Sequence, residues 1–251
     1  MRRHLWLLRL LVIAAALGVI EVLCRIGVIG TFTMQPPSQI AVDLWHVLAS
    51  GKHGAAIAKT LGNAAVALAL SLGVGIAAAV VIHRVRLARE ALEPLFATYY
   101  AVPVLAFYPL LIILFGVGDL PKIAIAFMLS VIAVIVNTLN GLDRVPWVLM
   151  KTARTLQMRQ WEAALRVTLP YAGPYILTGV KFAVAYSLIG IIGSEFIMSS
   201  DGIGAEIAFA YNNFDNATMY PLIALILIIS IGLNLLITVW EQAILVRRGL
   251  R

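Results

Sequence analysis

The residues best suited to contact a charged or amphipathic partner lie in a polar, basic segment, 142–170, between two long apolar stretches. Pro146 suits the first turn of a helix and no breaker follows before Leu156, so we expect one short helix there and a second from 160 to 168. Residues three and four apart share a helix face, which groups Leu149, Ala153 and Leu156 in the first helix and Trp161, Leu165 and Thr168 in the second. Amphipathic helices flanked by arginines can rest on anionic lipid headgroups or dock on another protein.

Long apolar segments must position this loop. With 62% hydrophobic and 12% charged residues among 251, the chain has too much apolar surface for a soluble domain, so we expect an integral membrane protein. Segments of about 20 apolar residues, each long enough to cross a bilayer, fall near 5–29, 60–83, 94–116, 121–141, 171–199 and 219–246. We predict an all-α fold with six transmembrane helices. The first is expected to stay uncleaved, because its apolar run is too long for a signal peptide and no cleavage site ends it.

Proline and glycine predict how these spans bend and pack. Pro103 and Pro109 each remove a backbone donor, so the third span should bend or break. The turn 116–121 contains two glycines and ends in proline, which predicts an antiparallel return and places the third and fourth spans side by side. Glycines of the second span are expected to allow close helix packing; they are Gly62, Gly73 and Gly75.

The distribution of lysine and arginine predicts the orientation, because basic residues are retained in the cytoplasm during insertion. One side of the membrane carries Arg2, Arg3, Arg9, Arg84, Arg86, Arg89, Arg144, Lys151, Arg154, Arg159, Arg166, Arg247, Arg248 and Arg251. The other side has Lys52, Lys59, Lys122 and a loop, 200–218, with acidic but no basic residues. Both termini and the 142–170 segment are therefore expected in the cytoplasm. Because the basic residues are spread over four inner segments, we expect no nucleic-acid surface.

No constellation of residues for catalysis stands out. The sequence lacks the Gly-x-x-x-x-Gly-Lys-Ser/Thr phosphate loop, so ATP hydrolysis would need another polypeptide. No paired carboxylates, histidine cluster or activated nucleophile point to one site, and Cys24 is alone. We expect no catalytic residue, metal or cofactor in this chain.

Ionisable side chains inside apolar spans are costly, so each is a candidate for function. Glu21 and Arg25 are four residues apart and should neutralise each other. Lys181 and Glu195 in the fifth span lie about 21 Å apart along one helix face, where Lys181 could attract an anion. Structural neutralisation of both charges is the alternative. The same pathway hypothesis includes Asn137, Tyr186, Ser187 and Ser194.

The loop also resembles the cytoplasmic loop of ATP-binding cassette importer permeases, whose consensus is Glu-Ala-Ala, three residues, Gly, nine residues, Ile, one residue and Leu-Pro. Matching positions are Ala153, Val167, Leu169 and Pro170. Departures from the consensus are Lys151 for the usual Glu, Thr152 for the first Ala and Gln157 for the Gly. A glycine there would end the first helix in a left-handed conformation, which should cost Gln157 about 1 kcal/mol.

The resemblance covers about 33–250 and is to the nitrate, sulfonate, taurine and bicarbonate permease group. Its supporting stretches are 36–38, 59–61, 92–94, 102–103, 109–110, 114–118, 170–171, 174–179, 194–195 and 202–204. The resemblance implies a type I ABC importer permease fold in a bacterial cytoplasmic (inner) membrane. It also implies a single permease domain over 1–251, with a core near 55–245 and a cytoplasmic coupling loop at 142–170.

This resemblance further implies a division of labour between chains. Two permease subunits, expected as a homodimer, would form the pathway, and two ATPase subunits would bind ATP and Mg²⁺ and receive the loops. A solute-binding protein would deliver cargo from outside, expected to be a small anionic or zwitterionic solute such as a sulfonate, nitrate or taurine. The implied coupling residues are Trp147, Leu149, Lys151, Ala153, Arg154, Leu156, Gln157, Trp161 and Leu165. The alternatives are a secondary transporter that needs no ATPase and a membrane scaffold.

Overall fold

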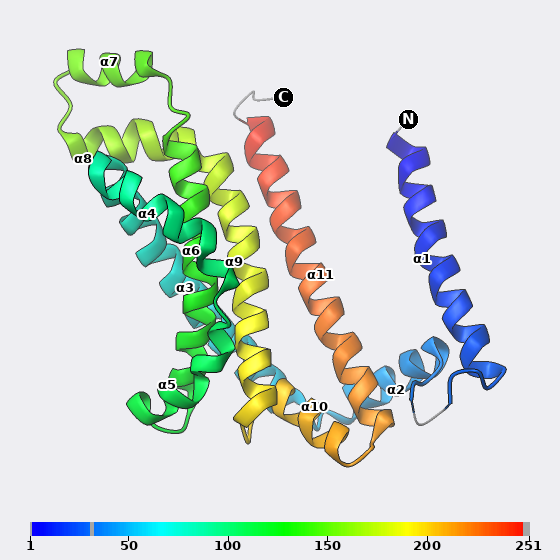
Figure 1. The fold of residues 1–251 in the computed structure, drawn as a ribbon. Coiled ribbons are helices and arrows are strands. Elements are labelled where there is room, and N and C mark those ends of the chain that lie inside the picture. The colour runs from blue at the N-terminus through cyan, green and yellow to red at the C-terminus, as the bar shows by residue number, and fades with distance from the viewer. Residues whose placement is uncertain (1, 31–32, 248–251) are drawn as a thin grey trace.

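The computed structural model describes residues 2–30 and 33–247, in which helices are joined by short turns and no strand occurs (Figure 1). The first half of the chain contains α1 (Arg2–Arg25), α2 (Pro37–Ser50), α3 (Gly54–Arg84), α4 (Arg86–Thr98), η1 (Tyr99–Ala101), η2 (Val104–Phe107), α5 (Tyr108–Phe115) and α6 (Asp119–Leu142). The second half contains α7 (Trp147–Thr155), α8 (Gln160–Ala163), η3 (Ala164–Thr168), α9 (Leu169–Met198), α10 (Ile203–Asn212) and α11 (Asn216–Arg247).

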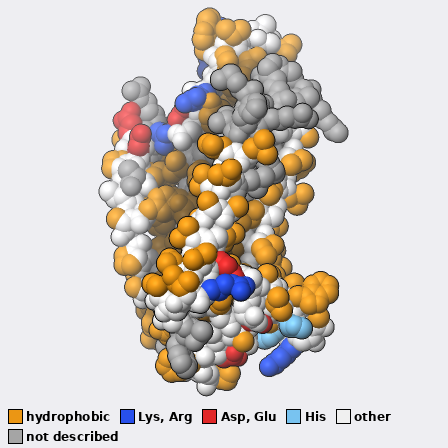
Figure 2. Space-filling view, turned by 90° about the vertical axis from the view of Figure 1, so that its right-hand side faces the viewer, with side chains coloured by type: hydrophobic (Ala, Val, Ile, Leu, Met, Phe, Trp, Pro, Cys, Tyr) orange, Lys and Arg blue, Asp and Glu red, His pale blue; other side chains and the backbone are white. Residues whose placement is uncertain are grey.

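Several of these helices can cross a membrane. In the described part of the chain, four are long and apolar enough: α3, α6, the continuous helix 160–197, and 216–243 within α11. A fifth span arises if 87–101 and 104–115, which meet at 85°, cross together. The predicted first span coincides with α1, and the count of six stays a prediction. Hydrophobic side chains cover much of the face shown in Figure 2, as expected for a multi-pass membrane protein.

The bend in the third predicted span occurs at the first of its two prolines. η1 ends at Ala101, and Val102 and Pro103 separate it from η2, so the two arms of the span meet at 85°. Pro109 instead lies in the first turn of α5, where a missing N–H removes no helical hydrogen bond. Gly116 and Gly118 then adopt φ angles of 78° and 152°, and the chain returns so that α5 packs against α6, as predicted.

The core forms where α6 packs against both α3 and α9. One buried side chain from each helix meets at its apolar centre: Ala67, Ala126 and Ile191. A Cβ added to Gly75 of α3 would lie 2.8 Å from the Val134 Cβ of α6, which confirms close packing at this glycine. Gly62 and Gly73 have no described atom within 4 Å of the position a Cβ would take, so the packing prediction is wrong for these two.

The two ends of the molecule carry different elements. In Figure 1, α7 and both chain termini lie at one end, the α7 end, and α2, α5 and α10 lie at the opposite end, the α10 end. α11 lies to one side of α9, and α1 stands farther out beside α2, so many apolar side chains of α11 and α1 are exposed. Among the basic residues behind the orientation prediction, Arg248 and Arg251 lie outside the described residues, as do the side chains of Arg2, Arg3, Arg9, Arg86 and Arg247.

Candidate functional site

α7 turns one side toward the protein and the other toward its surroundings. Ala153 is buried and Leu149 is half-buried. In contrast, Trp147 is 64% and Leu156 68% exposed. The predicted common face therefore does not include Leu156, which caps the helix instead of lying within it. The Lys151 ammonium lies 4.1 Å from the centre of the Trp147 ring, so the exposed side carries a cation–π pair.

Gln157 follows α7 with a φ of 52°, the left-handed conformation that the consensus glycine would adopt at this position. The Met158 N–H donates to the Ala153 carbonyl at 3.0 Å, and the Gln157 N–H donates to the Arg154 carbonyl at 2.9 Å. These two bonds form the Schellman motif that ends many helices, usually with glycine in the left-handed position. The left-handed conformation is therefore less favourable with glutamine at this position than it would be with glycine.

The predicted second helix of the loop is not a separate element. α8 runs into the π-helical turn η3 and then into α9, with no non-helical residue between them. In η3 a backbone N–H donates to the carbonyl five residues back, and this wider turn accommodates Pro170 in a continuous helix. The wider turn also shifts the register, so Thr168 is buried while Trp161 and Leu165 are exposed. The predicted common face of these three residues is therefore wrong.

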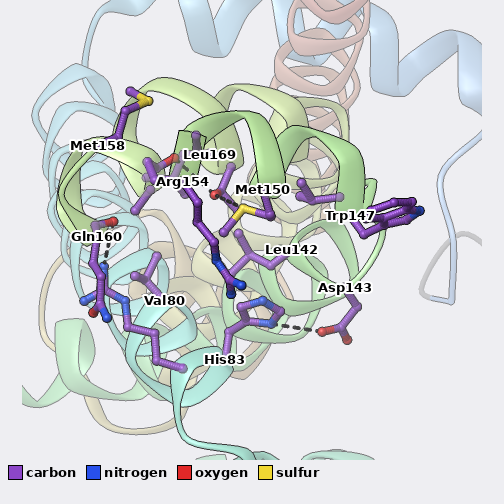
Figure 3. A pocket seen from close by; sticks show the side chains of 16 residues that line it. Val80, His83, Leu142, Asp143, Trp147, Met150, Arg154, Met158, Gln160 and Leu169 are labelled. Carbon is purple, nitrogen blue, oxygen red and sulfur yellow. Dashed lines mark hydrogen bonds and ion pairs between the residues drawn. The ribbon is translucent and has the colours of Figure 1, made fainter. Parts of the chain in front are cut away.

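A cleft of about 640 Å³ separates α7 from the ends of α3 and α6 and from the α8–α9 helix (Figure 3). On its polar wall, His83 Nδ1 lies 3.0 Å from Asp143 Oδ1, and Arg89 Nη2 lies 3.0 Å from the other carboxylate oxygen. Arg84 and Arg154 also line the cleft, and Arg154 projects into it alongside His83. The cleft therefore combines basic and apolar surface beneath the helix that the resemblance assigns to ATPase coupling.

At the α10 end, charged residues from three separate segments form one network. The Lys122 ammonium belongs to a side chain only 1% exposed and lies 2.9 Å from Asp119 Oδ1 and 2.5 Å from Asp201 Oδ1. Lys59 also bonds to Asp201 and lies 3.4 Å from Asp119 Oδ2. Burial alone would raise the pKa of the Asp201 carboxyl, but the hydrogen bonds donated by the two lysines outweigh it and hold this pKa well below its ordinary value.

Glu195 of α9 is fully buried beside this network. The Thr60 hydroxyl lies 3.0 and 2.8 Å from its two carboxylate oxygens, and the Gly204 N–H donates to one of them at 3.1 Å. Thr60 in turn accepts a 2.9 Å hydrogen bond from the Ile203 N–H. The carboxylate thus ties α3 and α9 to the first turn of α10. A Cβ at Gly204 would lie 2.7 Å from the Glu195 Cβ, so only glycine fits at this contact.

Four of the predicted pathway residues make their hydrogen bonds within the subunit: Asn137, Ser187, Ser194 and Glu195. Ser187 and Ser194 are buried, like Glu195, and their hydroxyls donate to carbonyls of their own helix at 3.0 and 2.8 Å. The Asn137 amide makes the same kind of bond within α6 at 2.8 Å. Because the two serines and Glu195 are inaccessible in this structure, they do not line an open route through it.

Lys181 and Tyr186 lie on the less buried side of α9. The Lys181 ammonium pairs with the carboxylate of Glu241 in α11, so charges from neighbouring helices neutralise each other. Tyr186 stacks on Tyr100, with ring centres 5.3 Å apart. Lys181 and Glu195, predicted to share a face, therefore contact different neighbours, α11 and α3 respectively.

Some charge pairs were predictable from the sequence and others were not. The predicted pair of Glu21 and Arg25 is confirmed, with Arg25 Nε 2.6 Å from Glu21 Oε1. The pairing of Lys122 with Asp201 was not predicted, because 79 residues separate them. A signal was present, since the membrane side that carries Lys59 and Lys122 also carries a loop with only acidic charges. Opposite charges on one side of a membrane protein are candidates for such a network.

Comparison with known proteins identifies the family. The family model for the binding-protein-dependent transport system inner membrane component matches residues 71–248. The riboflavin transport system permease protein RibX of Chloroflexus aurantiacus is 29% identical over 211 residues, which cover 84% of this chain and 79% of that protein. The nitrate import permease protein NrtB of Leptolyngbya laminosa is 28% identical over 230 residues, covering 88% and 81%. The putative aliphatic sulfonates transport permease protein SsuC of Bacillus subtilis is 25% identical over 203 residues, covering 81% and 74%. This chain therefore belongs to the binding-protein-dependent transport system inner membrane component family of ABC permeases, as a transport subunit and not an enzyme.

Proposed function

We propose that the chain is the membrane-spanning permease subunit of an ATP-driven importer and forms part of the pathway for a small anionic or zwitterionic solute. The family match supports import that depends on a separate solute-binding protein. Relatives named for nitrate and aliphatic sulfonates support an anionic cargo. The second permease subunit is proposed to be an identical copy.

The main observation that supports docking of an ATPase is the exposed side of α7. Trp147 and Leu156 present large apolar side chains at the α7 end, beyond the spanning part of α6 and α9. Apolar surface of this kind, next to the cation of Lys151, suits a protein partner. Each of two ATPase subunits, which bind ATP and Mg²⁺, would receive one such surface from one permease subunit.

The continuity of α8, η3 and α9 supports a mechanical role for the loop. No non-helical residue interrupts 160–197, and α9 packs against α3 and α6 in the core. Movement of α7 with a closing ATPase would therefore be transmitted along one helix into the membrane. Orientation follows from the same proposal: the α7 end and both termini lie in the cytoplasm, and the α10 end faces the binding protein.

The pathway is proposed to run along the less buried side of α9. This side carries Tyr186 and Lys181, whereas Ser187, Ser194 and Glu195 face the interior of the subunit. Because Lys181 is paired with Glu241, attraction of an anion by Lys181 requires that this ion pair opens during transport.

The docking proposal is tested with the permease, its ATPase and its binding protein reconstituted in liposomes. Replacing Trp147 and Leu156 together by Ala removes exposed apolar contacts and leaves the buried Ala153 unchanged. We expect cargo-stimulated ATP hydrolysis to fall about 30-fold, as for loss of a binding hot spot of about 2 kcal/mol. The amount of inserted permease should not change.

The matched control is Trp240→Ala, because Trp240 of α11 is 59% exposed but lies outside α7. Stimulated hydrolysis should be retained in this variant. Full stimulation in the Trp147 and Leu156 double variant would contradict the docking surface. Cargo uptake by the lone permease on an ion gradient would instead establish the secondary transporter.

A further inference from the structure

An apolar groove of about 600 Å³ runs along the outside of α3, where that helix meets α8 and η3. Leu72, Gly73 and Ile76 form its floor on α3, and Trp161 and Leu165 form its opposite wall. The position a Gly73 Cβ would take is open, with no described atom within 4 Å. Because Leu72, Gly73 and Ile76 belong to a helix long and apolar enough to cross a membrane, this side of the groove is suited to contact lipid chains.

The groove continues into the cleft beneath α7. Both hollows are lined by Val80, Arg84, Ala164 and Leu169, so Arg84 stands at their junction. Leu72 lies 12 residues before Arg84, a depth of about 18 Å along the helix axis. That depth matches the reach of an acyl chain from a headgroup at Arg84 into the hydrocarbon core, which is about 15 Å for one leaflet.

Arg84 is available to bind an anion. It donates to the backbone carbonyl of Gln160 at 3.5 Å, and in the described part of the chain no carboxylate pairs with Arg84 or Arg154. The nearby carboxylate of Asp143 is occupied by His83 and Arg89, each at 3.0 Å. The guanidinium of Arg84 at the junction of the two hollows is therefore not neutralised by a described carboxylate, and a guanidinium matches the geometry of a phosphate group.

We propose that the groove and the cleft together bind one anionic phospholipid, with an acyl chain along α3 and the phosphate at Arg84. An apolar groove at membrane depth excludes water and admits an acyl chain, and a basic residue at its end selects an anionic headgroup over a zwitterionic one. Trp161 lies where such a lipid would pass from chain to headgroup, a position favoured by tryptophan. The site shares Trp161 and Leu165 with the coupling residues that the resemblance implies, but its test uses no ATPase; only the assignment of its leaflet to the cytoplasmic side rests on the proposed function.

Fluorescence of Trp161 gives a direct test in the full chain. The other tryptophans, Trp6, Trp45, Trp147 and Trp240, are replaced by Phe. The protein is then placed in phosphatidylcholine vesicles with equal small fractions of lipid brominated on its acyl chains, either phosphatidylglycerol or phosphatidylcholine. We expect the brominated phosphatidylglycerol to occupy the site about fivefold more strongly, the preference that one basic residue near the surface provides.

Two pairs of variants distinguish lipid binding at this site from nonspecific attraction of anionic lipid to basic residues. Arg84→Gln should reduce quenching by phosphatidylglycerol to the phosphatidylcholine level, whereas Arg166→Gln, which removes a charge from η3 outside both hollows, should preserve the preference. Gly73→Leu should fill the groove and reduce quenching by both lipids. Gly62→Leu, at an equally open glycine of the same helix, should not. Circular dichroism checks that each variant keeps its helix content.

Three outcomes would overturn the proposal. Equal quenching by the two brominated lipids in the parent protein would show that the headgroup is not recognised. Equal losses in Arg84→Gln and Arg166→Gln would assign the preference to diffuse surface charge. Protection of Trp161 from both lipids would mean that protein, such as a second copy of the chain, covers the groove.

Discussion

The two ends of the bundle use charge in opposite ways. At the α10 end, Lys122 and Glu195 are buried, and each is met by partners from other segments. At the α7 end, Trp147 is exposed, and Arg84 and Arg154 meet no carboxylate in the described part of the chain. Buried charge is stable only when it is paired, whereas a surface that meets another molecule keeps its groups available. The charges of the α10 network are therefore satisfied within one subunit, whereas Arg84 and Arg154 at the α7 end are available to another molecule.

The largest loss of stability is expected when a methyl group is added to the tightly packed contact between α10 and α9. In Gly204→Ala the new methyl group would overlap the Ile192 carbonyl and lie 2.7 Å from the Glu195 Cβ. We expect a loss of about 3 kcal/mol in unfolding free energy, measured by thermal unfolding in detergent. Gly62→Ala is the control, since its site is open and alanine favours helix. Equal melting temperatures for the two variants would show that the α10 end is not tightly packed.

A somewhat smaller loss is expected when the buried network loses its cation. Lys122→Met leaves Asp119 and Asp201 without their central partner, and because both carboxylates are partly exposed to water we expect a cost of about 2–3 kcal/mol. The double variant with Asp201→Asn should recover part of it, as a double-mutant cycle in thermal unfolding would show. Strictly additive losses would mean that the two residues do not stabilise each other.

The ion pair between α9 and α11 tests whether paired charge can also serve transport. Lys181→Met leaves Glu241 unpaired and should destabilise the subunit by about 1–2 kcal/mol. If the pair is purely structural, adding Glu241→Gln should restore both stability and cargo uptake. If Lys181 attracts the anion, the double variant should regain stability and still lack uptake. Normal uptake by the Lys181→Met permease, with assembly and ATP hydrolysis intact, would exclude that role.

The smallest effect is expected at the α7 end, where the strain is local. Gln157→Gly relieves the left-handed conformation and should raise the unfolding free energy by about 0.5–1 kcal/mol. Thr152→Gly is the control, because Thr152 lies inside α7 and glycine there should be destabilising. A lower melting temperature for Gln157→Gly would show that the glutamine side chain contributes a contact that outweighs its strain.

Predictions from the sequence succeeded where the relevant atoms are close along the chain. The bend at Pro103 and the pair of Glu21 and Arg25 each depend on a few consecutive residues. The predicted face of Trp161, Leu165 and Thr168 failed because the π-helical turn η3 changed the register within a short distance. A pattern of three and four residues assumes a regular α-helix, and an inserted residue breaks that assumption.

By itself, the sequence determined that this is a helical membrane protein with a basic amphipathic loop, because apolar length, proline, glycine and charge act through nearby residues. Only the tertiary structure decided which charges are paired. Lys122 pairs with Asp201, which is 79 residues away in the sequence, and Lys181 pairs with Glu241, which is 60 residues away. Gly204 of α10 packs closely against Glu195 of α9. The physical reason is that pairing and close packing depend on the distance between side chains in space, and helix packing fixes that distance independently of separation along the chain.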